Sequence, residues 1–561
     1  MRKELLVAAG LIAGCFGSTA LAQQADTVVL ETRYWGESDT LYNLVLRQPA
    51  VDMANLPPAT EMIQKHGPLI NELETNLQTV QGAVSTSYTQ TSASKALAAV
   101  AGANFEGPGV GMPGFVLTGA PPDTTLAVGP TRVVAWVNSE YAVMTKTGTV
   151  LLLATGNTPF IGSGAGLCET TNRGDPILQY DRAADRWVLS QFAFATSGSS
   201  IIAPYQQCIA ISKTPDPAGA YFLYVVTFGS TSPDGFNDYG KLGIWPDGYY
   251  TSYNVFGGSP AGGNTGVALC ASERVKMLVG DPTAKTLCAP TAFYAGGSSF
   301  LPADMDGTTA PTTTAQGDIF VRYSFGGVSL RLMKLLPSYT TSTVTLTDGL
   351  GGASGSFVNL PVGPTTVSCN GAAGACIPQL GTTQLLDTLA DRLMYRLAYR
   401  NRAGVDSLVV NQSVDPDGVG ARASVVRWYE VRSPFAAAPV LFQNANYDPG
   451  ASTNRWMGSI AMDKLGNMMM GYSVSNAATN PSIRVTGRLR TDLKNQMQAE
   501  QTMFSGTGSQ TPTLSRWGDY TTMQTDPVDD CTFWYIGQYL AANGTFNWHT
   551  RIGSFKFNGC V

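Results

Sequence analysis

The stretch SRWGDYTTMQTDPVDDCTFWYIGQY (515–539) decides the fold of this chain. A polar head rich in arginine, aspartate and aromatic residues leads into a short run, a turn rich in aspartate, and a second run rich in aromatic and β-branched residues. Short β-prone runs on both sides of a turn are typical of a β-hairpin. The stretch therefore predicts a hairpin whose first strand follows directly on a charged segment.

Variants of this hairpin recur along the chain, beginning near residues 123, 174, 238, 391 and 455. Their turns fall near 129, 181, 247, 401 and 463, and several intervals are about 50–70 residues, near the repeat length of propeller blades. The segment 301–325 is a divergent copy with a longer turn. The repeats predict an all-β fold, a β-propeller of six to eight blades, with seven preferred. A β-sandwich, or two separate all-β domains, is the structural alternative.

Composition supports a β-rich extracellular protein. Of 561 residues, 44% are hydrophobic but only 13% are charged, and the 61 glycines and 32 prolines supply many turns. The formal net charge of −5 gives no basic footprint for nucleic acid.

The N-terminus predicts export. MRKE is positively charged, LLVAAGLIAG is a short apolar run, and Ala20-Leu21-Ala22 fits a cleavage site, so we interpret residues 1–22 as a secretory signal peptide. The alternative is lipidation at Cys15, because Ile12-Ala13-Gly14 before it fits a lipoprotein box. No later stretch reaches 18 apolar residues, so no transmembrane segment is predicted. We expect a secreted protein, extracellular or periplasmic, or one anchored to the cell surface by lipid.

Eight cysteines follow the signal region, and an even number in an exported protein predicts four disulfides. Their order suggests pairing between neighbours, although 105 pairings are open. The expected pairs are Cys168–Cys208, Cys270–Cys288, Cys369–Cys376 and Cys531–Cys560. A thiolate metal site is a weak alternative, because there is no CxxC pair.

Residues 23–105 have a different texture from the rest and are predicted to be a partly helical N-terminal extension and linker. Apolar residues recur at helical spacing in 59–84, interrupted at Gly67-Pro68. We interpret the extension as a spacer or clasp on the main domain, with a partner-binding arm as the alternative. The propeller domain is expected over 106–561.

The longer motifs of the main domain resemble those of a known group of proteins. PPDTTLAVGP, NRGDPILQYDRAADRWVLSQF, RWMGSIAMDKLGNMMMGYSVS and the closing RWGDY stretch are similar to a family of bacterial secreted proteins without an assigned activity. The likeness covers about 104–561. It implies a secreted, propeller-shaped domain, described for this family as sialidase-like, and it implies no catalytic residues.

The polar heads are the first candidate site. In a propeller the innermost strands begin at one end of the central axis, so their heads would meet in a central funnel. Converging arginines could bind a carboxylate, and aspartates could supply a general acid, base or nucleophile. The alternative is structural use, since a residue repeated in every blade serves each blade. The candidates are Asp123, Asp175, Asp238, Asp391, Arg392, Arg455, Arg516 and Asp519, with Tyr239 and Tyr520 beside them.

Calcium binding is the second candidate chemistry. Asp304-x-Asp306-Gly and Asp415-x-Asp417-Gly are short acidic loops of the kind that bind Ca²⁺, although the same pattern is a good turn. No other cofactor is predicted. A Ser-His-Asp hydrolase is disfavoured, because His549 is the only histidine of the main domain and no G-x-S-x-G motif occurs.

These observations favour a secreted propeller that binds an extracellular ligand, a glycan or a protein surface. A carbohydrate-active hydrolase or lyase of sialidase-like type, with its site in the funnel, is the first alternative. A structural component of the cell envelope is the second. Most of seven tryptophans of the main domain are expected to be core between blades: Trp187, Trp245, Trp428, Trp456, Trp517, Trp534 and Trp548.

Overall fold

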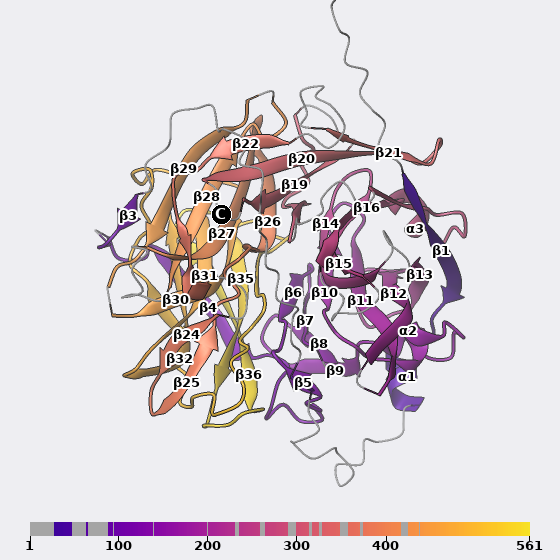
Figure 1. Cartoon of the computed structure of the whole chain (residues 1–561), viewed down its shortest axis with the longest axis horizontal. Helices are drawn as coiled ribbons and strands as arrows, with labels where there is room; N and C mark the ends of the chain where they lie inside the picture. The colour runs from indigo at the N-terminus through magenta and orange to yellow at the C-terminus, as the bar shows by residue number, and fades with distance from the viewer. Residues whose placement is uncertain are drawn as a thin grey trace, which may run out of the picture.

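The structure is a computed structural model of the whole chain (Figure 1). It describes residues 27–561 except 48–62, 65–87, 94, 139, 199, 230–234, 258–263, 290–298, 313–316, 325–327, 348–356, 371–373, 417–423, 437 and 451. The predicted signal peptide and Cys15 lie outside the described residues.

Antiparallel pairing arranges most strands into consecutive groups of four, each running from an inner to an outer strand. The first two groups are β6 (Thr125–Val128), β7 (Arg132–Trp136), β8 (Glu140–Thr145) and β9 (Val150–Thr155), then β10 (Ile177–Asp181), β11 (Arg186–Ser197), β12 (Ser200–Ser212) and β13 (Tyr221–Phe228). The next two are β14 (Phe236–Ile244), β15 (Tyr249–Phe256), β16 (Asn264–Ser272) and β17 (Thr286–Ala289), then β18 (Leu301–Met305), β19 (Asp318–Tyr323), β20 (Ser329–Ser338) and β21 (Thr343–Thr347).

The remaining groups complete the series. They are β26 (Leu393–Arg402), β27 (Val405–Asp415), β28 (Val425–Arg432) and β29 (Val440–Tyr447); β30 (Asn454–Met462), β31 (Met468–Asn476), β32 (Thr479–Arg488) and β33 (Gln501–Phe504); and β34 (Thr522–Thr525), β35 (Thr532–Leu540), β36 (Trp548–Phe557) and β4 (Ala99–Glu106). We assign these groups as blades 1 to 7 in the order given.

The inner strands form a ring. Each of β6, β10, β14, β18, β26, β30 and β34 contacts the next, and β34 contacts β6 again. Twisted sheets arranged in this way bury their faces against each other around a common axis. The predicted all-β propeller fold is confirmed, and the number of seven blades is our assignment within the described residues.

The repeated hairpins account for the inner two strands of each blade. The first two turns, predicted near 129 and 181, connect β6 to β7 and β10 to β11, and the aspartate-rich turn predicted within 515–539 connects β34 to β35. The divergent copy at 301–325 also forms a hairpin, because β18 pairs with β19 across a long connection. All seven tryptophans, of which most were expected in the core, are buried.

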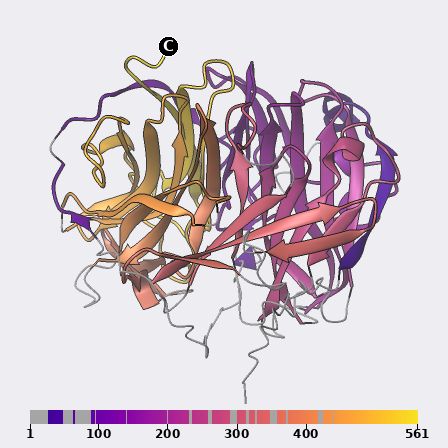
Figure 2. The ribbon, with the colours of Figure 1, turned by 90° about the horizontal axis from the view of Figure 1, so that it is seen from above.

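The segment before residue 107 contributes strands to the blades. β4 pairs antiparallel with β36, so the N-terminal side of the chain supplies the outer strand of the last blade (Figure 1). β1 (Val28–Glu37) pairs with both β13 and β17 at the outer rim between blades 2 and 3 (Figure 2). β3 (Thr89–Gln90) pairs with β29. The domain boundaries at 22 and 105 remain predictions, but 99–106 belongs to a blade.

Little helix is found in the described residues. α1 (Leu41–Arg47), α2 (Leu167–Thr170) and α3 (Arg274–Met277) are short, and 3-10 turns cover Thr158–Phe160 and Ser368–Asn370. The helix predicted over 59–84 lies outside the described residues, except that Ile63–Gln64 form β2, paired with β5 (Gly119–Ala120). Four additional strands pair at the margins: β22 (Val358–Pro361) with β20, β23 (Thr366–Val367) with β27, and β24 (Ala375–Gln379) with β25 (Thr382–Asp387).

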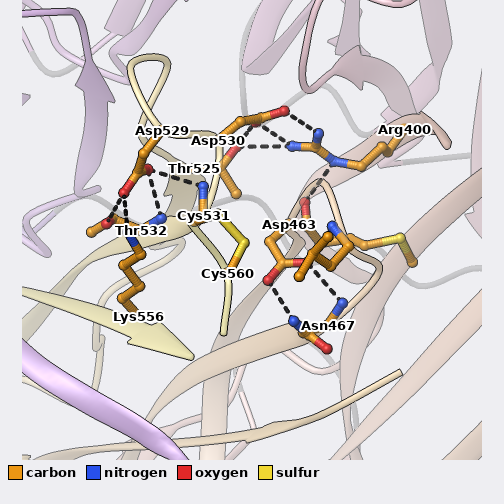
Figure 3. The surroundings of a disulfide bond; sticks show 12 residues. Arg400, Asp463, Asn467, Thr525, Asp529, Asp530, Cys531, Thr532, Lys556 and Cys560 are labelled. Atoms are coloured by element: carbon orange, nitrogen blue, oxygen red, sulfur yellow. Dashed lines mark hydrogen bonds and ion pairs between the residues drawn. A yellow bond between two sulfur atoms is a disulfide. The ribbon is translucent and has the colours of Figure 1, made fainter. Parts of the chain in front are cut away.

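The four predicted disulfides are all formed: Cys168–Cys208, Cys270–Cys288, Cys369–Cys376 and Cys531–Cys560. Such bonds form and persist in oxidising compartments, which fits an extracellular or periplasmic protein. Among the described residues, no helix has the length and apolar character of a membrane span. The Cys531–Cys560 bond joins the turn before β35 to the end of the chain after β36 (Figure 3).

Candidate functional site

Every blade carries a non-glycine residue with positive φ at or near the leading end of its inner strand, where φ lies between 47° and 60°. Residues other than glycine adopt this backbone conformation at an energetic cost, so the surrounding structure must enforce it. Because one such residue recurs in each blade, it serves the construction of the ring. The residues are Asp123, Asp175, Tyr239, Ser299, Leu389, Met457 and Asp519.

These leading ends bring most of the predicted site residues together. Electrostatic interactions connect Asp238 with Asp175, Arg516 and Lys241, and connect Tyr239 with the charges of Asp391, Arg392 and Asp123. Hydrogen bonds between blades also hold several of these residues close together. We call the following set the leading-end cluster: Asp123, Asp175, Asp238, Tyr239, Lys241, Asp391, Arg392, Arg516, Asp519 and Tyr520.

Backbone contacts fix the positions of the cluster. The amide of Asp123 donates to Gly518 O (3.1 Å), which joins blades 1 and 7. The amide of Asp175 donates to Asn138 Oδ1 (2.8 Å), which joins blades 1 and 2. The hydroxyl of Tyr239 donates to Asp519 O (3.2 Å) and so connects blades 3 and 7 across the axis.

Two of the predicted aspartates are bound by an arginine close to them in sequence. Arg392 donates to both oxygens of Asp391, at 2.7 and 3.0 Å. Arg516 likewise forms a two-point ion pair with Asp519. Bidentate pairs of this kind hold both partners in a fixed geometry. The structural alternative therefore describes these two aspartates better than a catalytic role.

The pKa of the Asp238 carboxyl group is strongly raised. Its side chain is partly exposed, and burial, together with the nearby charge of Asp175, raises its pKa from 3.8 to about 7. Arg516 and Lys241 act in the opposite direction but less strongly. A carboxyl group that keeps its proton near neutral pH, close to a second carboxyl group, can donate that proton to a bound molecule.

Lys241 also belongs to the leading-end cluster, although the sequence pattern did not single it out. Its Nζ lies 3.4 Å from the ring centre of Tyr239 and 4.0 Å from that of Tyr520, so the ammonium is held between two aromatic faces. Burial lowers its pKa to about 7, although the aspartates Asp175 and Asp123 favour the charged form. YGKLGIW contains this lysine, but only the ring of blades shows that it faces the cluster.

Arg455 is not part of the cluster. Its guanidinium donates to both carboxylate oxygens of Glu500, at 2.9 and 3.0 Å, and lies 3.6 Å from Asp448. The prediction placed Arg455 at the axis because it heads a hairpin like the others. The side chain instead turns toward the outer part of its own blade, where Arg484 also pairs with Glu500.

The first predicted calcium loop has another use. Asp304 and Asp306 both pair with Arg396, at 2.6 Å each, deep in the ring, and Asp304 also accepts from Gln179 (2.8 Å). The protein thus provides its own cation for these carboxylates, so the structure gives them a role in holding the inner strands together. In the second loop, Asp415 ends β27 and Asp417 lies outside the described residues.

A second ion-pair network closes the trailing ends of the inner strands. Asp530 accepts from Arg400 at 2.5 and 2.7 Å and from Arg182 at 3.0 Å, which links blades 7, 5 and 2. Figure 3 shows Asp530 and Arg400 beside the Cys531–Cys560 disulfide. The described part of the chain contains no group of three or more histidine, cysteine, aspartate or glutamate side chains placed to hold a metal ion.

Comparison with known proteins gives likeness of shape only. No protein-family model matches the chain, and no curated protein matches it. Among solved structures, the α-L-arabinofuranosidase Arb93A of Fusarium graminearum is 8% identical, with 85% of this chain and 98% of that chain covered and a TM-score of 0.31.

Other solved structures match at a similar level. The GH43 endo-arabinanase of Bacillus licheniformis is 10% identical, covering 58% of this chain and 96% of that chain, with a TM-score of 0.27. Drosophila Plexin A, solved in complex with Semaphorin 1b, is 8% identical, covering 84% and 89%, with a TM-score of 0.31. Arabinan-cleaving enzymes and Plexin A both appear, and likeness at this level carries no argument about activity.

Proposed function

We propose that this protein is an exported carbohydrate-active hydrolase that acts at the leading-end cluster, with Asp238 as general acid and Asp175 as the second carboxyl group. The observation that supports this proposal is the raised pKa of Asp238. Glycoside hydrolysis needs one carboxyl group that holds a proton and a second that acts as nucleophile or base. Asp238 can be the group that holds the proton, because burial and the neighbouring charge of Asp175 raise its pKa to about 7.

The cations of the cluster suit a glycan carrying a negative group. Arg516 and Lys241 interact with Asp238, and Arg392 lies 4.5 Å from the Tyr239 ring centre. Their positive charge would help to hold a carboxylate of the substrate near the proton donor. A lyase acting on an acidic sugar would use the same groups, so the identity of the product separates the two reactions.

A second candidate is a propeller that binds an extracellular glycan or protein surface without turning it over. The bidentate pairs Asp391–Arg392 and Arg516–Asp519 favour this candidate, since they show that part of the cluster is used to build the ring. The proposed family of bacterial secreted proteins and the cell-envelope alternative remain predictions.

The test is a screen for reducing-end release from neutral and acidic polysaccharides. Asp238→Asn keeps the size of the side chain but removes the transferable proton, and should lower turnover about 10²–10⁴-fold. Asp281→Asn, at a partly exposed aspartate of the same blade outside the leading-end cluster, is the matched control and should retain activity. Activity of the natural protein should fall as pH rises through about 7, because Asp238 then loses its proton. Binding of a polysaccharide without any turnover would instead support the second candidate.

A further inference from the structure

A cleft of about 300 Å³ lies at the trailing ends of blades 5 and 6. It is lined by the turn after β26, the turn after β30, the loop after β32 and the chain end after β36. The lining residues are Arg402, Lys464, Leu465, Asn467, Leu489, Arg490, Thr491, Asn558 and Gly559. We call it the basic cleft. β26 separates Arg402 from Arg392 of the leading-end cluster by ten residues, which is roughly 30 Å of strand.

Two arginine side chains converge on one glycine at this cleft. A Cβ on Gly466 would lie 2.7 Å from Arg402 Nε and 3.2 Å from Arg490 Cδ. Gly466 also has φ of +88°, which other residues rarely adopt. The turn therefore needs glycine for its backbone and for the space that the two arginines occupy. Lys464, two residues earlier in the same turn, adds a third cation.

No ion pair holds these three cations among the described residues. In the described part of the chain, none of the side chains of Arg402, Lys464 and Arg490 forms an ion pair, and the buried Nε of Arg402 has no hydrogen-bond acceptor. Burial and the nearby charges of Arg490 and Arg432 lower the pKa of Arg402, and the weaker effects of Glu430 and Asp463 act in the opposite direction. By contrast, Arg396 and Arg455 are bound directly by carboxylates.

The cleft is held rigidly. Asp463 accepts from the amides of Leu465 (2.9 Å) and Asn467 (2.8 Å) and from Asn467 Nδ2 (2.8 Å), as Figure 3 shows in part. Asn467 Oδ1 in turn accepts from the amide of Arg490 (2.9 Å) and joins the two loops. The Cys531–Cys560 disulfide fastens the chain end that forms the remaining wall.

We propose that the basic cleft binds a carboxylate or sulfate group of an acidic polysaccharide, at a site separate from the leading-end cluster. Three convergent cations match a single anionic group, because a guanidinium fork can donate two hydrogen bonds to one carboxylate or sulfate. Leu465 and Leu489 offer apolar walls to the carbon–hydrogen face of the sugar ring. Since the whole chain carries a net charge of −5, attraction of a polyanion depends on this local excess of positive charge.

The test measures binding of the full chain to polygalacturonate, heparin and dextran by affinity electrophoresis at two salt concentrations. Polygalacturonate supplies carboxylates, heparin supplies sulfates and carboxylates, and dextran is neutral. The natural protein should bind at least one polyanion and not dextran, more weakly at about 200 mM than at about 50 mM salt. Arg490→Ala and Lys464→Ala should each weaken binding about tenfold, and Arg490→Lys should weaken it less. Tighter binding of polygalacturonate than of heparin would identify carboxylate as the preferred group.

Controls separate this site from general charge and from the proposed activity. Arg186→Ala, at the start of β11 in blade 2, removes one positive charge and should bind like the natural protein. Among the described residues, the Arg186 guanidinium donates only to backbone carbonyls, at 3.3 and 2.8 Å. Asp238→Asn should lose turnover but keep binding at the basic cleft. The proposal is overturned if the natural protein binds neither polyanion, or if Arg186→Ala weakens binding as much as Arg490→Ala.

Discussion

The substitution Asp238→Asn should change how the stability of this protein depends on pH. Burial and the charge of Asp175 raise the pKa of Asp238 from 3.8 to about 7 in the folded protein. Between these two values the folded chain holds a proton that the unfolded chain has lost. Stability therefore falls as pH rises through this range, and the loss is complete above about pH 7.

The size of the effect follows from the same pKa difference. At about 1.4 kcal/mol per pKa unit, the change from 3.8 to about 7 corresponds to about 4 kcal/mol. Because the Asp238 side chain is partly exposed, solvent screening reduces this figure, and we expect about 2 kcal/mol. The asparagine side chain of the variant cannot ionise. Relative to the natural protein, Asp238→Asn should thus be about 2 kcal/mol more stable at pH 8 and nearly equal at pH 4.

Urea unfolding followed by tryptophan fluorescence at pH 4, 6 and 8 measures this difference. A second variant tests how much the charge of Asp175 contributes to the raised pKa of Asp238. Asp175→Asn removes the charge that repels ionised Asp238, so the pH dependence attributed to Asp238 should become smaller. If the natural protein and Asp238→Asn differ by the same free energy at all three pH values, Asp238 ionises alike in the folded and unfolded chains and the reasoning is refuted.

Three further substitutions test the construction of the ring. Arg396→Met should lower the free energy of unfolding by about 3–5 kcal/mol, measured in urea, because two buried aspartates lose their cation; a loss below about 1 kcal/mol would contradict this. Replacing Cys531 and Cys560 by serine frees a loop with a sequence separation of 29 and should cost about 3–4 kcal/mol, with unchanged far-ultraviolet circular dichroism. Gly471→Ala should lower the midpoint of thermal unfolding, because its Cβ would lie 2.6 Å from the Tyr535 ring; an unchanged midpoint would show that the ring can move.

Sequence reasoning located the repeated part of the fold because each blade contains the same local pattern. The hairpin heads, their turns and the pairing of neighbouring cysteines depend on residues close in the chain. β4 was missed for the opposite reason. Its sequence AVAGANFE is small and weakly patterned, and it becomes a strand because β36 offers it an unpaired edge. An edge contributed by a segment about 450 residues away leaves no local signal.

The candidate site was predicted in part for a similar reason. Equivalence between repeats placed Asp175, Asp238 and Arg516 together, and the structure brings them together. The same equivalence placed Arg455 there, yet its side chain pairs with Glu500, and only packing decides between these two directions. Lys241 was overlooked because a single lysine in a strand is usually exposed, whereas this one is buried between two tyrosines.

The pairing of β4 with β36 has a consequence for the way this chain is made. Arg551 and Glu106 are partners in that sheet at a sequence separation of 445, and contacts of such range form slowly. During synthesis β4 must wait for β36 before its blade can form. The ring therefore stays open until β36 has been made. A circular permutant that joins residue 561 to residue 99 would make this contact local and should refold faster, with the blades unchanged.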